Sequence, residues 1–164
     1  MFTTTYSVEM HLKLKFYRVV NRMETCRIYL SGGMGNLSFE EQSKWRKQVI
    51  NAIKFNGYDY EKKPVFFNPV DHYNFTDIRY KSEREVMEFD LNALRHSDLV
   101  IVNFNDLKSI GTAMELMLAK EMHIPVIGWN PSNEKLHPWL AECTTRLCDD
   151  LRETVEHVVE FYLN

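Results

Sequence analysis

The sequence contains few cysteines and no long apolar run, and both absences limit what the protein can be. Its three cysteines, Cys26, Cys143 and Cys148, are odd in number and not spaced as CxxC, so neither a disulfide framework nor a zinc site is indicated. Apolar stretches such as residues 99–102 are far shorter than the roughly 18 residues that span a bilayer, and the N-terminus has no signal-like apolar region. We therefore expect a cytoplasmic protein without a membrane partner.

An excess of positive charge is also missing. The 164 residues carry 20 Lys and Arg against 23 Asp and Glu, which gives a formal net charge of −3. Such a chain lacks the electrostatic attraction that binds phosphate backbones, so a nucleic-acid polymer is not an expected partner. With 45% hydrophobic and 13% aromatic residues the chain can instead bury one sizeable core, and its length suits a single domain.

Short β-branched runs alternate with longer segments of helical period, a pattern typical of an α/β sandwich with a parallel sheet. Strands are predicted at 27–31, 65–67, 99–104 and 125–128. The apolar run at 99–102 is continuous rather than alternating, which indicates a central strand that is buried on both faces.

Helices are predicted between these strands. Three of them have a Ser or Thr followed three residues later by Glu, the capping-box pattern, and the pairs are Ser38/Glu41, Ser82/Glu85 and Thr112/Glu115. A fourth helix, about 150–163, is predicted from an apolar stripe.

Residues 1–25 stand apart from this alternation. Residues 12–16 alternate like a strand, but no stop signal surrounds them, and Met23 stands just before the first predicted core strand. We assign 1–25 to an N-terminal extension, which could add an edge strand, and 26–164 to the domain.

The loop after the first predicted strand, at 31–36, contains Gly32, Gly33 and Gly35. Glycines there let backbone amides approach a ligand at the start of a helix, so a phosphate or a sugar could bind. A tight turn that needs positive φ explains the same residues. Neither a complete GxGxxG nor a GK[ST] is present, so dinucleotide and P-loop sites are not indicated.

Asp90 interrupts an apolar helix face. It follows Val86 by four residues and precedes Leu94 by four, in the middle of the stripe of the predicted helix at 82–97. A buried carboxylate is costly unless hydrogen bonds or a ligand compensate for the lost water, and such carboxylates are frequent in active sites. The alternative is a structural hydrogen bond to a backbone group or to the Tyr29 hydroxyl.

Glu115 has two explanations. It could complete the Thr112 capping box, and it also follows residues 103–111 at the carboxyl end of the predicted central strand, where open α/β sheets bind ligands. The helix dipole there would keep it ionised. An ionised Glu115 that faces Asp90 could attack an anomeric carbon and manage the proton of a leaving group.

The sequence gives less support to metal-dependent or serine-hydrolase chemistry. The six histidines show no metal-ligand spacing, and no HExxH helix or Ser-His-Asp order is visible, so neither a metal centre nor serine-hydrolase chemistry is expected. The polar and aromatic segment 68–73 could stack on a base or simply cover the sheet.

Three segments in this order resemble the nucleoside 2-deoxyribosyltransferase superfamily, which includes the nucleoside 5′-monophosphate N-glycosidases. They are residues 28–33 (IYLSGG), 89–91 with 97–101 (FDL and SDLVI), and 109–116 (SIGTAMEL). The resemblance covers about residues 26–164. It implies a flavodoxin-like three-layer sandwich around a five-stranded parallel sheet, and it implies no cofactor.

By this resemblance Glu115 is the nucleophile that forms a covalent glycosyl intermediate, Tyr29 holds its carboxylate, and Asp90 contacts the base or the proton in transit. Ser109 stands where transferases of the family usually have an acidic residue, and a serine there would suit a 5′-phosphate. Further expected substrate contacts are Ser31, Gly32, Gly33, Asn103, Gly111 and His137. The family also implies a homo-oligomer with shared active sites, in which residues 130–139 reach a neighbouring site.

The resulting prediction is an N-glycosidase of nucleoside 5′-monophosphates, with a nucleotide or nucleoside as its ligand. Base exchange between deoxyribonucleosides is the nearest alternative, because the same carboxylates would serve it. A cytokinin-activating phosphoribohydrolase is suggested by Gly111, Thr112 and Glu115, although the preceding glycine pair is missing. A nucleotide-sensing module without turnover is the alternative outside enzymes.

Overall fold

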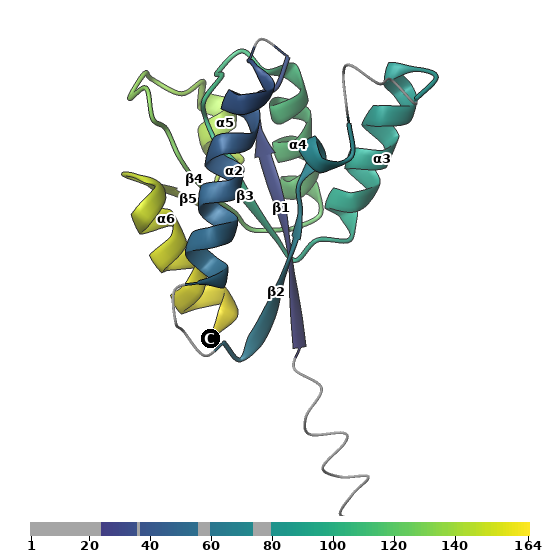
Figure 1. Ribbon diagram of the computed structural model, residues 1–164. Coiled ribbons are helices and arrows are strands. Elements are labelled where there is room, and N and C mark those ends of the chain that lie inside the picture. Colours follow the sequence, from purple (N-terminus) through teal and green to yellow (C-terminus); the bar gives the residue numbers. More distant parts are fainter. Residues whose placement is uncertain (1–23, 36, 56–59, 74–79) are drawn as a thin grey trace, which may run out of the picture.

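The computed structural model describes residues 24–35, 37–55, 60–73 and 80–164, which form a five-stranded sheet with helices on both faces (Figure 1). All neighbouring strands are parallel, and their order across the sheet is β2-β1-β3-β4-β5. The strands are β1 (Glu24–Gly32), β2 (Lys62–Phe67), β3 (Leu99–Asn103), β4 (Val126–Trp129) and β5 (Arg146–Cys148). This order and direction are those of a flavodoxin-like fold, which confirms the predicted sandwich.

Helices connect the strands and cover both faces of the sheet. They are α2 (Phe39–Lys54), the 3-10 turn η1 (Pro69–Asp71), α3 (Glu83–Arg95), α4 (Ile110–Glu121), α5 (Pro138–Glu142) and α6 (Leu151–Val158), which continues into a π-helical turn, η2 (Val159–Leu163). Side chains of α2 and α6 pack on one face, and those of α3 and α4 on the other. None of the helices in the described part of the chain is long and apolar enough to cross a membrane.

Alternation along β1 divides its side chains between two apolar cores. Ile28 and Leu30 pack with residues of α2 and α6, whereas Tyr29 packs with residues of α3 and α4. Ser31 follows Tyr29 by two residues, so it shares the face that α4 covers. β3 is buried along its whole length, as expected for a central strand.

The four predicted strands are present with small shifts at their ends. β1 begins at Glu24, so residues 24 and 25 pair with β2 instead of belonging to the predicted extension. The strand-like segment at 12–16 lies outside the described residues. β5 and α5 were not located from the residues, because each is short and most of its side chains are exposed.

Two of the three predicted capping pairs open helices where expected. Ser38 and Glu41 form a complete capping box at the start of α2. Ser82 caps α3, but the Glu85 carboxylate accepts a hydrogen bond from the Lys81 amide instead of the Ser82 amide. This second box is therefore only half formed.

The third predicted capping box is wrong. α4 is capped by Ser109, whose Oγ accepts hydrogen bonds from the Thr112 amide at 3.3 Å and from the Thr112 hydroxyl at 2.9 Å. The helix therefore begins three residues earlier than the Thr112 pair implied. Thr112 lies inside the helix, and Glu115 has no capping role.

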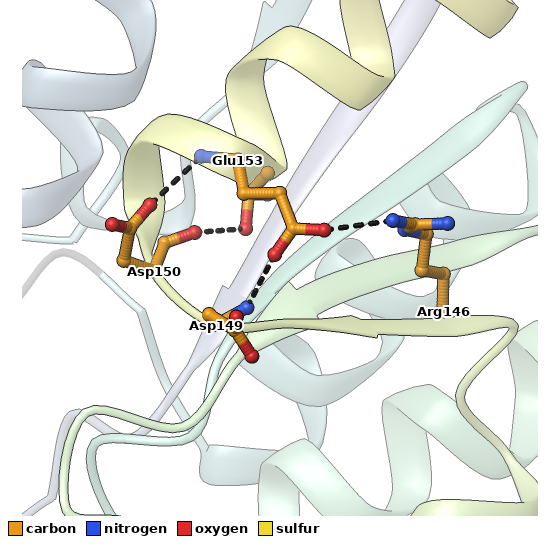
Figure 2. Close-up of polar contacts among 5 residues, drawn as sticks. Arg146, Asp149, Asp150 and Glu153 are labelled. Carbon is orange, nitrogen blue, oxygen red and sulfur yellow. Dashed lines mark hydrogen bonds and ion pairs between the residues drawn. The ribbon is translucent and has the colours of Figure 1, made fainter.

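Figure 2 shows how α6 begins beside the edge strand β5. Asp150 is the N-cap and accepts a hydrogen bond from the Glu153 amide at 2.8 Å. The Glu153 carboxylate accepts from the Asp149 amide at 2.6 Å and from Arg146 at 2.7 Å, and these bonds lower its pKa. The helix predicted at 150–163 is confirmed, with a π-helical last turn.

Candidate active site

Four polar side chains meet at the carboxyl end of the sheet, around the adjoining ends of β1 and β3. Tyr29 and Ser31 come from β1, Asp90 from α3 and Glu115 from α4. From β1 the chain continues to β2 on one side of the sheet, and from β3 it continues to β4 on the other side. Open α/β sheets bind ligands where the strand order reverses in this way. All four residues were expected at the site from the sequence.

Two hydroxyl groups hold the Glu115 carboxylate. Tyr29 donates a hydrogen bond to Oε1 at 2.8 Å, and Ser31 donates one to Oε2 at 2.6 Å. The two donors are two residues apart on β1, so their side chains lie on the same face of the sheet. Each carboxylate oxygen therefore has its own donor, and the direction of the carboxylate is set.

Opposing influences determine the ionisation of Glu115. Withdrawal of its carboxylate from water raises the pKa, whereas the hydrogen bonds from Ser31 and Tyr29 and the charge of Arg46 lower it. Glu115 is the sixth residue of α4, beyond the first turn to which the dipole effect is confined. Burial is the largest of these influences, so the pKa of Glu115 is raised overall, and it is the hydroxyl donors and Arg46, not the helix dipole, that favour the ionised form.

Asp90 is the second carboxylate of the site and is only 7% exposed. Its Oδ1 accepts a hydrogen bond from the Tyr73 hydroxyl at 3.2 Å, so its partner is Tyr73 and not Tyr29. Burial and, after it, the negative charge of Glu115 raise the pKa of Asp90 from 3.8 to about 7. Asp90 is therefore able to give and take a proton near neutral pH.

Arg46, in α2, is a buried cation that the sequence analysis missed. It is fully buried, and its guanidinium donates hydrogen bonds to the carbonyl oxygens of Leu30, Gly32 and Gln42. The guanidinium also lies 4.4 Å from the centroid of the Trp45 ring. Burial lowers its pKa to about 10, which leaves it charged at neutral pH. Its burial could have been predicted from its position in the sequence, because Arg46 follows Gln42 by four residues and lies on the helix face that carries the apolar stripe.

Gly32 and Gly33 are explained by close packing and not by a positive φ. No glycine in the described part of the chain has φ in the left-handed region. A Cβ on Gly32 would lie 2.9 Å from the Trp45 ring, and a Cβ on Gly33 would lie 2.6 Å from the Asp106 Cβ. Asn105, which the sequence analysis also missed, accepts a hydrogen bond from the Gly33 amide at 2.9 Å and donates one to the Gly33 carbonyl.

The remaining predicted contacts are spread along the carboxyl end of the sheet. Ser109 caps α4, and Gly111 in its first turn is exposed, with open space where a Cβ would stand. Asn103 is buried, and alternation along β3 directs its side chain to the face covered by α2, away from Glu115. His137 is exposed and caps α5. Within the described residues, neither Asn103 nor His137 forms a hydrogen bond with the two carboxylates.

Aromatic rings pack beside the two carboxylates. Phe67 stacks on Tyr29 with 5.4 Å between ring centroids, and on His72 with 4.8 Å. Phe89 lies against both Phe67 and His72. The segment 68–73 thus covers the end of the sheet, while Phe89, which is 46% exposed, keeps part of its ring available to a planar ligand.

The arrangement is suited to displacement at a sugar carbon. One carboxylate is oriented to attack, and a second carboxyl group can supply a proton to the leaving group. Among the residues described, no group of three or more His, Cys, Asp and Glu side chains is placed to hold a metal ion.

A comparison with protein families matches most of the chain. The family model described as nucleoside 2-deoxyribosyltransferase aligns with residues 28–160. A comparison of the sequence with curated proteins finds no significant match.

Solved structures share the fold at low sequence identity. A 2-deoxyribosyltransferase from Bacillus psychrosaccharolyticus has a TM-score of 0.62 at 18% identity, over 79% of this chain and 90% of that one. A 2-deoxyribosyltransferase from Leishmania mexicana has a TM-score of 0.55 at 15% identity, over 84% and 99% of the two chains. A CMP N-glycosidase from Clostridium botulinum has a TM-score of 0.51 at 16% identity, over 82% and 99%.

Proposed function

This chain belongs to the nucleoside 2-deoxyribosyltransferase family, and from that premise we propose that it cleaves the N-glycosidic bond of a nucleoside 5′-monophosphate and releases the free base. The observation that carries the proposal is the pair of hydroxyl bonds from Tyr29 and Ser31 that orients the Glu115 carboxylate. A carboxylate held in this way is prepared for nucleophilic attack. Asp90 adds a carboxyl group that can hold a proton at neutral pH.

The reaction divides into two steps on these side chains. Glu115 attacks C1′ of the sugar, the C1′–N bond breaks, and its electron pair leaves with the base, which takes the proton of neutral Asp90. A glycosyl ester of Glu115 and an ionised Asp90 result. Water then attacks C1′ and gives its proton to Asp90, and the C1′–O bond to Glu115 breaks to restore the carboxylate.

The preference for a monophosphate rests on the start of α4. Ser109 is the N-cap, and no acidic side chain lies in the first turn of the helix. The first amides of a helix lack partners within it, and the helix dipole favours an anion there. Ser31 and Gly33 already bond within the protein. We therefore assign the phosphate to Ser109 and to the exposed backbone at Gly111.

Base exchange between deoxyribonucleosides is the second candidate. The family and two of the similar structures carry the name of this activity, and the glycosyl ester of Glu115 is common to both reactions. The two reactions differ in whether a free base competes with water for that ester. A nucleotide-sensing module would bind the ligand and carry out neither reaction.

The test is to incubate the protein with nucleoside 5′-monophosphates and nucleosides, with and without a free acceptor base, and to follow base release by chromatography. We expect release from a monophosphate, and Glu115→Gln should lower it by about a thousandfold or more while the fold is kept. Intact-protein mass spectrometry of quenched wild-type reactions should show the glycosyl adduct.

The matched control is Glu121→Gln, which changes an exposed glutamate at the end of the same helix. It should release base at the wild-type rate. Equal rates for wild type and Glu115→Gln would contradict the role of Glu115, and transfer to the added base in place of hydrolysis would favour base exchange.

We also propose that the chain forms a homo-oligomer whose active sites are completed by a neighbouring copy. Its support is a set of exposed apolar side chains on α4 and α5. These are Ile110, Met114, Met117 and Trp139, which are 76%, 46%, 45% and 77% exposed. The molar mass in solution, measured by light scattering, tests this proposal.

A further inference from the structure

The hydroxyl of Tyr73 lies between the Asp90 carboxyl group and the backbone of the helix that carries it. It is 3.2 Å from Asp90 Oδ1 and 3.2 Å from the carbonyl oxygen of Val86. Tyr73 is buried, and its ring packs edge-on against Tyr80 and Phe89. The hydroxyl therefore has a defined position between two acceptors.

A phenol has one proton to donate and lone pairs with which to accept, whereas the Val86 carbonyl can only accept. When Asp90 is ionised, Tyr73 donates to the carboxylate. When Asp90 is protonated, its carboxyl group can donate to the Tyr73 oxygen, while Tyr73 donates to Val86. Both protonation states of Asp90 are therefore hydrogen-bonded without movement of a heavy atom.

We propose that Tyr73 is a positioning residue for Asp90, which holds the carboxyl group in one place while it loses and regains a proton. The proposal rests on the proposed function, in which Asp90 protonates the departing base and takes a proton back from water. As Asp90 loses its proton, the Tyr73 hydroxyl turns from Val86 to the carboxylate, and it turns back when the proton returns. No proton is gained or lost by Tyr73 in this exchange.

Other groups that face Asp90 act on its charge and do not replace Tyr73. Glu115 on α4 opposes ionisation of Asp90, and the Arg46 guanidinium on α2 favours it. The Tyr29 hydroxyl on β1 is engaged by Glu115. In the described part of the chain, Tyr73 is the side chain that forms a hydrogen bond with Asp90.

Tyr73→Phe tests the proposal, because it removes the hydroxyl and keeps the ring. Both forms of Asp90 lose a partner, but the ionised form loses the stronger, charge-assisted bond. The pKa of Asp90 should therefore rise by about one unit, measured by carboxyl-carbon NMR titration with Asp90→Asn to assign the signal. We expect kcat/KM to fall by roughly tenfold to a hundredfold at neutral pH, mainly through kcat.

A second variant keeps the hydrogen bond and should shift the pKa of Asp90 in the opposite direction. The substitution of 3,5-difluorotyrosine for Tyr73 makes the phenol a stronger donor, so the pKa of Asp90 should fall. This variant also tests the proposal if Tyr73→Phe unfolds. Tyr162→Phe removes a hydroxyl on the opposite face of the sheet and serves as the control.

The titration of Asp90 tests the role of Tyr73, and the activity assay tests the proposed function, so the two can fail independently. An Asp90 titration that is unchanged in both Tyr73 variants overturns the proposal, whatever the activity. The expected opposite shifts support the hydrogen-bonding role of Tyr73 even where the wild-type protein releases no base, and that absence would overturn the proposed function alone.

Discussion

Glu115 and Asp90 are two carboxylates of one site that differ in the hydrogen bonds they accept from the described residues. Among the described residues, Glu115 accepts a hydroxyl bond at each oxygen, whereas Asp90 accepts one, from a Tyr73 hydroxyl that also reaches Val86. Each hydrogen bond to the charged form favours that form, while burial opposes it. These surroundings are the reason why we propose Glu115 as the attacking group and Asp90 as the proton carrier.

Removing the ionisable group at position 90 should change how stability depends on pH. The folded-state pKa of Asp90 is about 7 against an ordinary value of 3.8, so between these pH values the folded protein holds a proton that the unfolded chain has lost. The free energy of unfolding therefore falls as the pH rises through this window, by at most about 4 kcal/mol. Asp90→Asn should lack this contribution and keep that of Glu115, whose pKa burial also raises, so above about pH 7 it should gain stability relative to wild type.

Urea denaturation across this pH range measures the effect. Glu88→Gln, which changes an exposed carboxylate on the same helix, should keep the pH dependence of the wild type. Parallel stability curves for wild type and Asp90→Asn would mean that Asp90 titrates alike in the folded and unfolded states.

At the scale of the element, the start of α4 decides the position of Glu115. The Ser109 cap places Glu115 in the second turn of the helix, where it faces the hydroxyl groups of β1. A helix that began at Thr112 would have used the same carboxylate to cap its own first turn. The earlier start thus leaves Glu115 without a capping role and places its carboxylate beside Tyr29 and Ser31.

Ser109→Asp and Ser109→Asn separate helix capping from phosphate recognition. Asp and Asn cap helices about as well as Ser, so both variants should stay within roughly 0.5 kcal/mol of the wild-type stability. Only Asp adds a negative charge at the start of α4. We expect Ser109→Asp to lower the ratio of kcat/KM for a monophosphate to that for its nucleoside by about tenfold or more, which corresponds to about 1.4 kcal/mol.

Steady-state kinetics with one monophosphate and its parent nucleoside give this ratio for each variant, and thermal unfolding checks the cap. An equal loss in the Asp and Asn variants would assign the effect to the lost hydroxyl and not to charge. A wild-type ratio near or below unity would contradict the preference for a monophosphate.

At the scale of the whole molecule, the sheet leaves no room for a side chain at Gly128. Gly128 lies opposite Val102 in the pairing of β4 with β3. A Cβ at Gly128 would lie 2.3 Å from the Val102 carbonyl oxygen and 2.4 Å from its Cγ1. Since Val102 belongs to a fully buried strand, β3 or β4 would have to move.

Gly128→Ala should therefore destabilise the protein by about 1–3 kcal/mol or more, through overpacking in the sheet. Gly35→Ala is the control, because a Cβ there would meet no atom within 4 Å, and it should stay within about 0.5 kcal/mol of wild type. Guanidinium denaturation measures both. A Gly128→Ala variant as stable as wild type would show that the strands can separate at little cost.

Features that depend on near neighbours and on periodicity could be predicted from the residues alone. The continuous apolar run at 99–102 predicted the central strand, and Ser38 with Glu41 predicted the start of α2. A carboxylate in the middle of an apolar helix face marked Asp90 as unusual. Such patterns are readable because strand alternation, helical period and capping involve residues within a few positions of one another.

Which side chains meet at the site depends on the packing of elements that are far apart in the sequence. Tyr29 and Ser31 are 86 and 84 positions from Glu115, and the local sequence of Glu115 equally suited a capping box. Arg46 and Tyr73 were not predicted at the site because their contacts depend on how α2 and α3 pack against the sheet. The residues next to a side chain in the sequence do not indicate which distant group will contact it. These partners are therefore defined only when the helices pack against the sheet.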